Sequence, residues 1–185
     1  MSIIYNASIP TKRYVEQSIC DDSYTSRNYR LANIEEVYDR EPGLRKVLDE
    51  APIGNHHSKI LIDVKVQNLS KGQYTCVNKG WHLDGKGIIR QRTSHDSLFH
   101  IIQWGGAPTL FIKHPFSCDG WGIHQTMLAK HLHLDVNPRY ELEPYIYHSY
   151  GEFHWHRCGQ ATEDCTRFFI RIIESDYIKE RKIKG

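Results

Sequence analysis

The chain has 185 residues, of which 39% are hydrophobic and 25% are charged, and its formal net charge is +2. This composition is typical of a soluble globular protein that is long enough to form one domain with its own core. A net charge so near zero gives no reason to expect nucleic-acid binding from charge alone.

The cysteines and the apolar runs limit the class of protein further. The five cysteines are odd in number and include no CxxC pair, which argues against a disulfide framework and against a cysteine-rich zinc site. No apolar run approaches the length needed to cross a bilayer, and the first residues do not resemble a signal peptide. We therefore expect a cytoplasmic protein with no membrane partner.

Residues 1–59 are predicted to form an N-terminal extension of mixed structure. Residues 1–30 are polar and tyrosine-rich and show no helical stripe, so irregular structure with one or two short strands is expected. Apolar residues recur at helical spacing over 34–50, with Asn33 as the expected N-cap. Pro42-Gly43 interrupts this pattern, which predicts two short helices in place of one long helix.

From residue 60 onward, short β-branched and aromatic stretches are separated by turn residues. Strands are predicted at residues 60–66, 74–77, 99–104, 109–113, 145–147 and 167–173. The pattern over 121–133 predicts a helix that places His124 and His131 near one face. We interpret these two histidines as a surface or core-edge pair in preference to a metal pair, because no carboxylate lies at matching spacing.

The order of these elements predicts a mainly β fold with N-terminal helices (α+β). Helices that lie mostly ahead of many short strands are typical of a β-sandwich or a jelly-roll barrel with helical decoration. No internal repeat or low-complexity linker divides the chain. We therefore predict a single domain over residues 1–185, with its core at 60–173 and a basic tail at 174–185.

His82 and Asp84 are the first candidate metal ligands. They stand at i and i+2 after an apolar, β-branched run, and in a strand such side chains point to the same face. A second histidine from elsewhere would complete a two-histidine, one-carboxylate set, which leaves three positions open on an octahedral Fe(II) ion. The same two residues can instead be a buried hydrogen-bonded pair that holds a turn, because short His-x-Asp matches also arise by chance.

A second group of candidates lies near the C-terminus. Ten residues separate His156 from Arg167, and a histidine that closes one strand can face the same barrel mouth as an arginine that opens the next. Arginine offers a planar, permanently charged fork for the far carboxylate of a metal-bound 2-oxo acid. His154 and Arg171 stay open as alternatives, because each shares a strand face with the preferred residue.

This order of residues resembles the Fe(II)/2-oxoglutarate-dependent dioxygenases, in particular their small, often phage-encoded, members. The resemblance covers residues 60–173 and rests on His82-x-Asp84, the distant His156 and Arg167. It implies a double-stranded β-helix fold, Fe(II) bound by the two histidines and the aspartate, 2-oxoglutarate as a cosubstrate held by Arg167, and O₂ as the oxidant. The expected cytoplasm is that of the host if the protein is phage-encoded.

One hydrogen-bond donor to 2-oxoglutarate is not accounted for by this resemblance. Phe169 stands where the family often has a serine. Tyr74 is a weak candidate for that donor. Arg171 can hold either 2-oxoglutarate or the substrate.

The resemblance implies an enzyme that hydroxylates a C–H bond, but the sequence identifies neither the substrate nor the oligomeric state. A stacking wall and a basic rim for a nucleobase or nucleotide can come from Trp81, Trp104, Trp121, Trp155, Lys86, Arg90 and Arg92. Tryptophans are also common in cores, so a protein side chain or a small metabolite stays open. The alternative function is a non-catalytic jelly-roll module, structural or binding, with a vestigial or structural metal site.

Overall fold

The structure, a computed structural model, describes residues 2–5, 10–21, 25, 27–54, 57–77, 80–82, 84, 97–113, 116–119, 139–152 and 154–183. The helix predicted at 121–133 lies outside these residues, and with it Trp121, His124 and His131. Lys86, Arg90 and Arg92 of the expected basic rim also lie outside them.

The described elements are mainly antiparallel strands with a few short helices, which confirms the mainly β prediction. The helical elements are α1 (Gln17–Asp21), α2 (Ile34–Arg40), the 3-10 helix η1 (Pro42–Leu44) and α3 (Arg45–Asp49). The strands are β1 (Ser2–Tyr5), β2 (Thr11–Tyr14), β3 (Tyr29–Asn33), β4 (Ile60–Leu69), β5 (Ser97–Trp104), β6 (Thr109–Ile112), β7 (Phe116–Asp119), β8 (Arg139–Glu141), β9 (Ile146–Gly151), β10 (His156–Cys158) and β11 (Cys165–Ser175). They form a six-stranded sheet in the order β2-β9-β5-β11-β4-β3, a three-stranded sheet in the order β10-β6-β8, and the pair β1-β7.

The helical break predicted at Pro42 is confirmed. Helix α2 ends at Arg40, and η1 and α3 follow it as separate short elements. Asn33 caps α2, because its Oδ1 accepts a hydrogen bond from the backbone N–H of Glu35 at 2.9 Å. Helix α1 is not predicted by the sequence, since five residues are too few to show a helical period.

Five of the six predicted strands are present, within β4, β5, β6, β9 and β11. The strand predicted at 74–77 is wrong, because Tyr74 makes only an isolated bridge to Gln160 and the following residues bend. The carbonyl of Thr75 accepts its hydrogen bond from a side chain, Gln67 Nε2, at 2.8 Å. Strands β7, β8 and β10 are not predicted, since each has only three or four residues.

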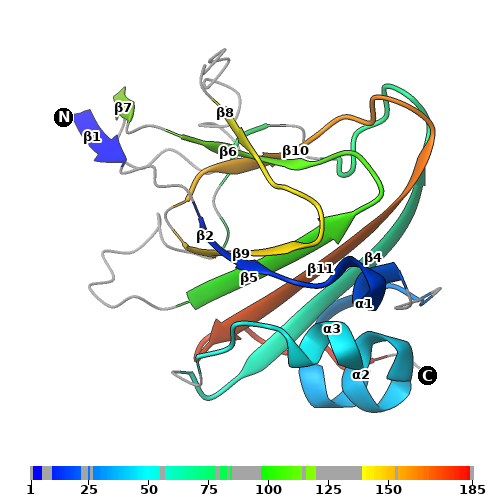
Figure 1. The fold of residues 1–185 in the computed structure, drawn as a ribbon. Helices are drawn as coiled ribbons and strands as arrows, with labels where there is room; N and C mark the ends of the chain where they lie inside the picture. The colour runs from blue at the N-terminus through cyan, green and yellow to red at the C-terminus, as the bar shows by residue number, and fades with distance from the viewer. Residues whose placement is uncertain are drawn as a thin grey trace.

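The six-stranded sheet separates two apolar layers, with the helices on one side and the three-stranded sheet on the other (Figure 1). On the helical side, Ile170 of β11 belongs to a cluster with Val37 and Val47. On the opposite side, Phe169 belongs to a cluster with Phe111 of β6. Successive side chains of a strand point to opposite faces, so β11 contributes to both layers.

Polar side chains interrupt the second apolar layer. The antiparallel register of β11 and β4 pairs Arg171 with Asp63, Phe169 with Lys65 and Arg167 with Gln67. Since residues at i and i+2 share a face, these six side chains form one patch on the side that the three-stranded sheet covers. The candidate site is built on this patch.

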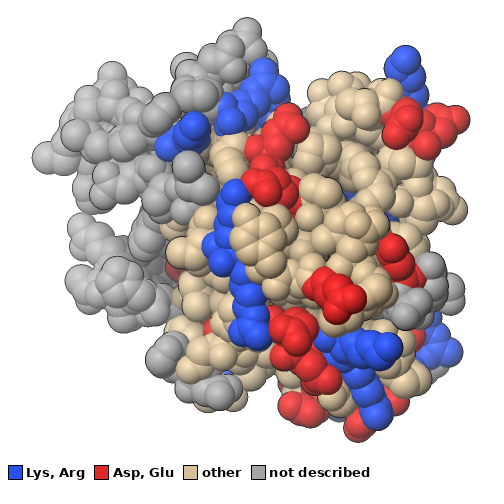
Figure 2. Space-filling model, viewed as in Figure 1, with Lys and Arg blue, Asp and Glu red and all other residues tan. Residues whose placement is uncertain are grey.

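The outer surface carries both signs of charge. On the face in Figure 2, Lys and Arg side chains lie beside Asp and Glu side chains. Arg13 and Glu50, for example, form an ion pair at 3.1 Å. The described part of this face therefore has no large region of one sign, in keeping with the net charge of +2. Among the described residues, no helix is long and apolar enough to span a membrane.

Glu174 offers a test of the buried polar contacts of the large sheet. Its side chain is fully buried, and its Oε1 accepts hydrogen bonds from His100 Nε2 and from the backbone N–H of Gly54, both at 2.9 Å. Leaving a buried donor without its acceptor costs about 1–3 kcal/mol. We therefore expect Glu174→Ala to lower the free energy of unfolding by about 2 kcal/mol or more in urea denaturation.

The control for this test is Glu163→Ala, because Glu163 is exposed at the surface. Its free energy of unfolding is expected to stay within about 0.5 kcal/mol of wild type. Equal losses in the two variants would contradict the importance of the Glu174 contacts.

Candidate metal centre

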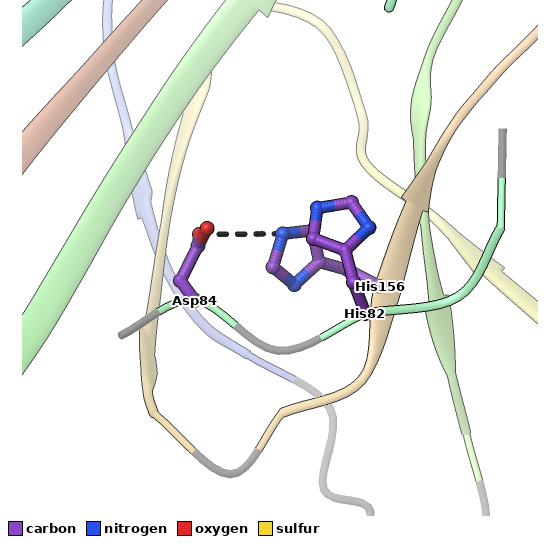
Figure 3. Close-up of side chains that lie close together, drawn as sticks. All are labelled: His82, Asp84 and His156. Carbon is purple, nitrogen blue, oxygen red and sulfur yellow. Dashed lines mark ion pairs between the residues drawn. The ribbon is translucent and has the colours of Figure 1, made fainter. Parts of the chain in front are cut away.

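Three side chains with metal-binding atoms converge beside the polar patch: His82, Asp84 and His156 (Figure 3). One ligand atom from each lies within 4.8 Å of the others, so together they could hold a metal ion. The two histidines come from distant parts of the chain and are joined by a backbone bridge. The N–H of His82 donates to the carbonyl of His156 at 2.8 Å, and the reverse bond measures 3.0 Å.

The local structure around His82 differs from the expected strand. His82 lies on an isolated bridge, not on a regular strand. His156 is the first residue of β10 and pairs with Phe111 of β6. The three-stranded sheet therefore holds His156, and His156 in turn holds His82.

Backbone carbonyls orient both imidazole rings. Nδ1 of His82 lies 3.1 Å from the carbonyl oxygen of Gly80, and Nδ1 of His156 lies 3.1 Å from that of His154. A carbonyl only accepts, so Nδ1 of the neutral His82 ring carries the proton and its Nε2 presents a lone pair. The Nε2 of His156 faces the carboxylate of Asp84 at 3.2 Å. Histidines that bind metals through one ring nitrogen commonly donate a hydrogen bond from the other nitrogen to a carbonyl of this kind.

The carboxylate of Asp84 is held by three neighbours. Its Oδ2 lies 2.6 Å from Arg171 Nη1, 2.8 Å from the hydroxyl of Tyr150 and 3.2 Å from His156 Nε2. Burial alone would raise the pKa of Asp84, but Arg171 and His156 together hold it well below its usual value. Asp84 is therefore ionised at neutral pH, as a carboxylate ligand must be.

The imidazole ring of His82 is uncharged at neutral pH, as a metal ligand must be. Burial, and then the neighbouring ring of His156, lower the pKa of His82 to about 4. The ring is thus neutral at physiological pH, and no proton has to leave before it binds a cation.

The triad opens onto a cavity of about 220 Å³ between the two sheets. Four cationic side chains line this cavity, but Asp84 is the one carboxylate among the described lining residues. The four cations are Lys65, Arg157, Arg167 and Arg171. The cavity is therefore positively charged even though the chain as a whole is nearly neutral.

Arg167 is a buried cation whose hydrogen bonds go to neutral groups. It is 3% exposed, and it donates to Gln67 Oε1 at 3.2 Å, Gln103 Oε1 at 2.8 Å and Thr109 Oγ1 at 3.2 Å. Burial lowers the pKa of Arg167 to about 10, so the guanidinium stays protonated at neutral pH. Its Nε has no hydrogen-bond partner among the described residues. A buried cation without a carboxylate partner favours the binding of an anion beside it.

Arg171 is already neutralised, which distinguishes it from Arg167. Its Nε donates to Asp63 at 3.1 Å and its Nη1 to Asp84 at 2.6 Å. The sequence left two candidates, Arg167 and Arg171, for the arginine that binds 2-oxoglutarate. Arg171 forms ion pairs with Asp63 and Asp84 and therefore positions the triad. Arg167 forms no ion pair with a carboxylate among the described residues.

Two other expected residues lie apart from the triad. His154 precedes β10, and its Nδ1 lies 3.1 Å from the backbone N of Gly151. It contributes its carbonyl, not its ring, to the orientation of His156. Tyr74 is not among the residues that line the cavity, whereas its neighbours Thr75 and Cys76 are.

The tryptophans of the described chain belong to the interior. Trp81 and Trp155 are each 1% exposed and Trp104 is 6% exposed. Trp104 stacks on Phe168 with 5.2 Å between ring centroids. These three residues therefore serve packing and do not present a free stacking wall.

No family model and no curated protein matches this chain. Among solved structures, the chain is similar to the crystal structure of EvdO2 from Micromonospora carbonacea var. aurantiaca, with 12% sequence identity and a TM-score of 0.45. The similarity covers 82% of this chain and 66% of that chain. So distant a likeness carries no inference about function.

Metal binding tests the triad directly. Equilibrium dialysis against Mn(II) or Ni(II) is expected to give one tightly bound ion per wild-type chain. His82→Ala and His156→Ala each remove one of three protein ligands and should abolish this binding. His154→Ala is the matched control and should retain it, because the ring of His154 lies outside the triad. Loss of metal in His154→Ala with retention in His156→Ala would move the third ligand two residues upstream.

The lowered pKa of His82 predicts a pH dependence of the metal-free protein. The unfolded chain protonates histidine near about pH 6.5, whereas folded His82 resists protonation until about pH 4. The unfolded state therefore binds more protons in this window, and the free energy of unfolding falls as the pH drops. His82 contributes at most about 1.4 kcal/mol per pH unit.

Urea denaturation of chelator-treated protein between pH 4 and pH 8 measures this effect. The His82→Gln variant is expected to lose less stability on acidification than wild type, because it removes the group responsible. An identical pH profile in both proteins would contradict the burial of a neutral His82.

Proposed function

We propose that this protein is an Fe(II)- and 2-oxoglutarate-dependent oxygenase that hydroxylates a C–H bond of its substrate. The observation that carries the proposal is the presence, in one cavity, of a metal-binding group and an anion-binding group. One is the triad of His82, Asp84 and His156. The other is Arg167, a buried cation that lacks a carboxylate partner among the described residues.

The donor set of the triad fits Fe(II). Two neutral imidazoles and one carboxylate are the ligands of non-haem Fe(II) oxygenases, and three protein ligands leave coordination positions for other molecules. The ring of His82 is neutral, Asp84 is ionised, and Nε2 of His156 lies 3.2 Å from the Asp84 carboxylate. Fe(II), when bound, supplies the redox chemistry that consumes O₂ and 2-oxoglutarate.

The residues of the chain bind and orient the cosubstrate. Arg167 offers its fork to the far carboxylate, in a buried position where such a charge-assisted bond is strong. Gln67 and Gln103 hold that fork in place. Arg171 and Tyr150 hold the carboxylate of Asp84. Phe169 and Ile101 form an apolar part of the cavity wall.

We assign the fold, as part of this proposal, to the double-stranded β-helix. Support comes from the six-stranded and three-stranded antiparallel sheets that face each other with the cavity between them. A further support is that one ligand of the triad, His156, comes from the smaller sheet while Arg167 and Arg171 of β11 come from the larger one.

The substrate belongs to one of three classes: a nucleobase or nucleotide, a protein side chain, or a small metabolite. Burial of Trp81, Trp104 and Trp155 removes the stacking wall that favoured the first class. The cationic lining of the cavity favours an anionic group on whatever molecule enters it.

Arg167→Ala tests the cosubstrate assignment. Removing one side of a buried arginine–carboxylate pair typically costs about 3–5 kcal/mol. We therefore expect calorimetric titration of the Ni(II)-loaded variant to show 2-oxoglutarate binding weakened by at least about a hundredfold. Metal affinity should stay near wild type, because Arg167 does not contact the triad. Arg167→Lys should recover only part of the loss, since lysine keeps the charge without the fork.

Arg171→Ala is the informative comparison. It leaves Asp63 and Asp84 without their shared cation, so it should weaken metal binding itself. If Arg167→Ala binds 2-oxoglutarate like wild type, while Arg171→Ala retains metal and loses 2-oxoglutarate, the clamp belongs to Arg171. If wild type binds no 2-oxoglutarate at all, the non-catalytic jelly-roll module becomes the better description.

A further inference from the structure

A lysine lies between the two cavity-lining arginines of β11, Arg167 and Arg171. Lys65 is the middle member of a polar row on β4, with Asp63 on one side and Gln67 on the other. Asp63 accepts a bond from Arg171 at 3.1 Å, and Gln67 accepts one from Arg167 at 3.2 Å. Lys65 lines the cavity between these two bonded pairs.

Lys65 and Arg167 share one aromatic ring. The register of the sheet sets Lys65 opposite Phe169. Lys65 Nζ lies 5.5 Å from the centroid of the Phe169 ring, and Arg167 Cζ lies 4.6 Å from it. Both distances fall within the range of cation–π attraction. Two positive groups therefore stand beside the same apolar ring inside the cavity.

No carboxylate pairs with either cation among the described residues. Asp63, which neighbours Lys65 on the same face of β4, and Asp84, which lines the cavity, both form ion pairs with Arg171. Burial, and next the charge of Arg171, lower the pKa of Lys65, whereas the charge of Asp63 acts in the opposite direction. Arg167 is buried and Lys65 is half-buried, and a charge removed from water is costly without a partner, so an anion bound between them would stabilise both.

We infer that Lys65 and Arg167 together bind the far carboxylate of the 2-oxo acid, and that Lys65 makes the cavity selective for a dicarboxylate over a monocarboxylate. This inference rests on the proposed function for the metal-binding end of the same ligand. The arginine fork orients the carboxylate plane, whereas the lysine adds a point charge from the neighbouring strand. The ring of Phe169, which lies beside both cations, forms an apolar wall of this position.

The test compares 2-oxoglutarate with 2-oxovalerate, two five-carbon 2-oxo acids that differ in the far carboxylate. Each is titrated calorimetrically into Ni(II)-loaded wild type, Lys65→Met and Lys71→Met. Lys71 is exposed and does not line the cavity, so its variant is the matched control. We expect Lys65→Met to weaken 2-oxoglutarate binding by about ten- to a hundredfold, as for a lost bond between charged groups. Binding of 2-oxovalerate should be unchanged in every variant.

A second substitution separates charge from packing. Lys65→Arg keeps a cation and should retain most of the 2-oxoglutarate affinity, whereas Lys65→Gln should lose it as Lys65→Met does. Equal binding of 2-oxoglutarate to wild type and Lys65→Met, or equal losses for the two ligands, would overturn the role of Lys65. The iron proposal would survive either of those results.

Failure of the proposed function has a different signature. If wild type binds neither 2-oxo acid, the iron proposal fails, and titration of glutarate into the metal-free protein then decides the anion site alone. Glutarate binding that is lost in Lys65→Met supports a two-cation site. Absent glutarate binding, or binding that does not depend on Lys65, overturns it.

Discussion

The geometry of the site depends on the two ion pairs that the guanidinium of Arg171 forms. The guanidinium bonds Asp63 on the adjacent strand and Asp84 in the triad, so it ties the candidate metal ligands to the largest sheet of the molecule. Asp63 is buried, and the side chains of Arg171 and Asp84 are only 20% and 14% exposed, so removing one member of these ion pairs leaves a poorly solvated charge. The position of Asp84 is therefore set by the protein before any metal binds, and Tyr150 reinforces it from β9.

The parts of the molecule that can be predicted from the sequence are those with a short-range signature. The apolar alternation of β4, β5 and β11 predicts the core of the large sheet, and Asn33 with Pro42 predicts the helical break. The triad also follows from residue type and order, since His82 and Asp84 need only close spacing. We expected a regular strand to position His82, but an isolated backbone bridge to His156 positions it.

The rest depends on register between distant strands, which local patterns do not encode. Arg167 and Arg171 look equivalent in sequence, but pairing with Gln67 and with Asp63 gives them different partners. A signal for this was present, because Asp63, Lys65 and Gln67 place three polar residues on one face of an otherwise apolar strand. The strand expected at 74–77 is absent because the chain bends there, and Tyr74 does not line the cavity.

The central claim is that one cavity holds both a metal at the triad and a 2-oxo acid at the cationic wall. The most direct measurement is an anaerobic titration of 2-oxoglutarate into Fe(II)-loaded protein, followed by its metal-to-ligand charge-transfer absorption. The account predicts a visible band that saturates at one 2-oxoglutarate per chain and is absent in His82→Ala, which lacks a metal ligand. A wild-type protein that binds Fe(II) but develops no band at millimolar 2-oxoglutarate would contradict it.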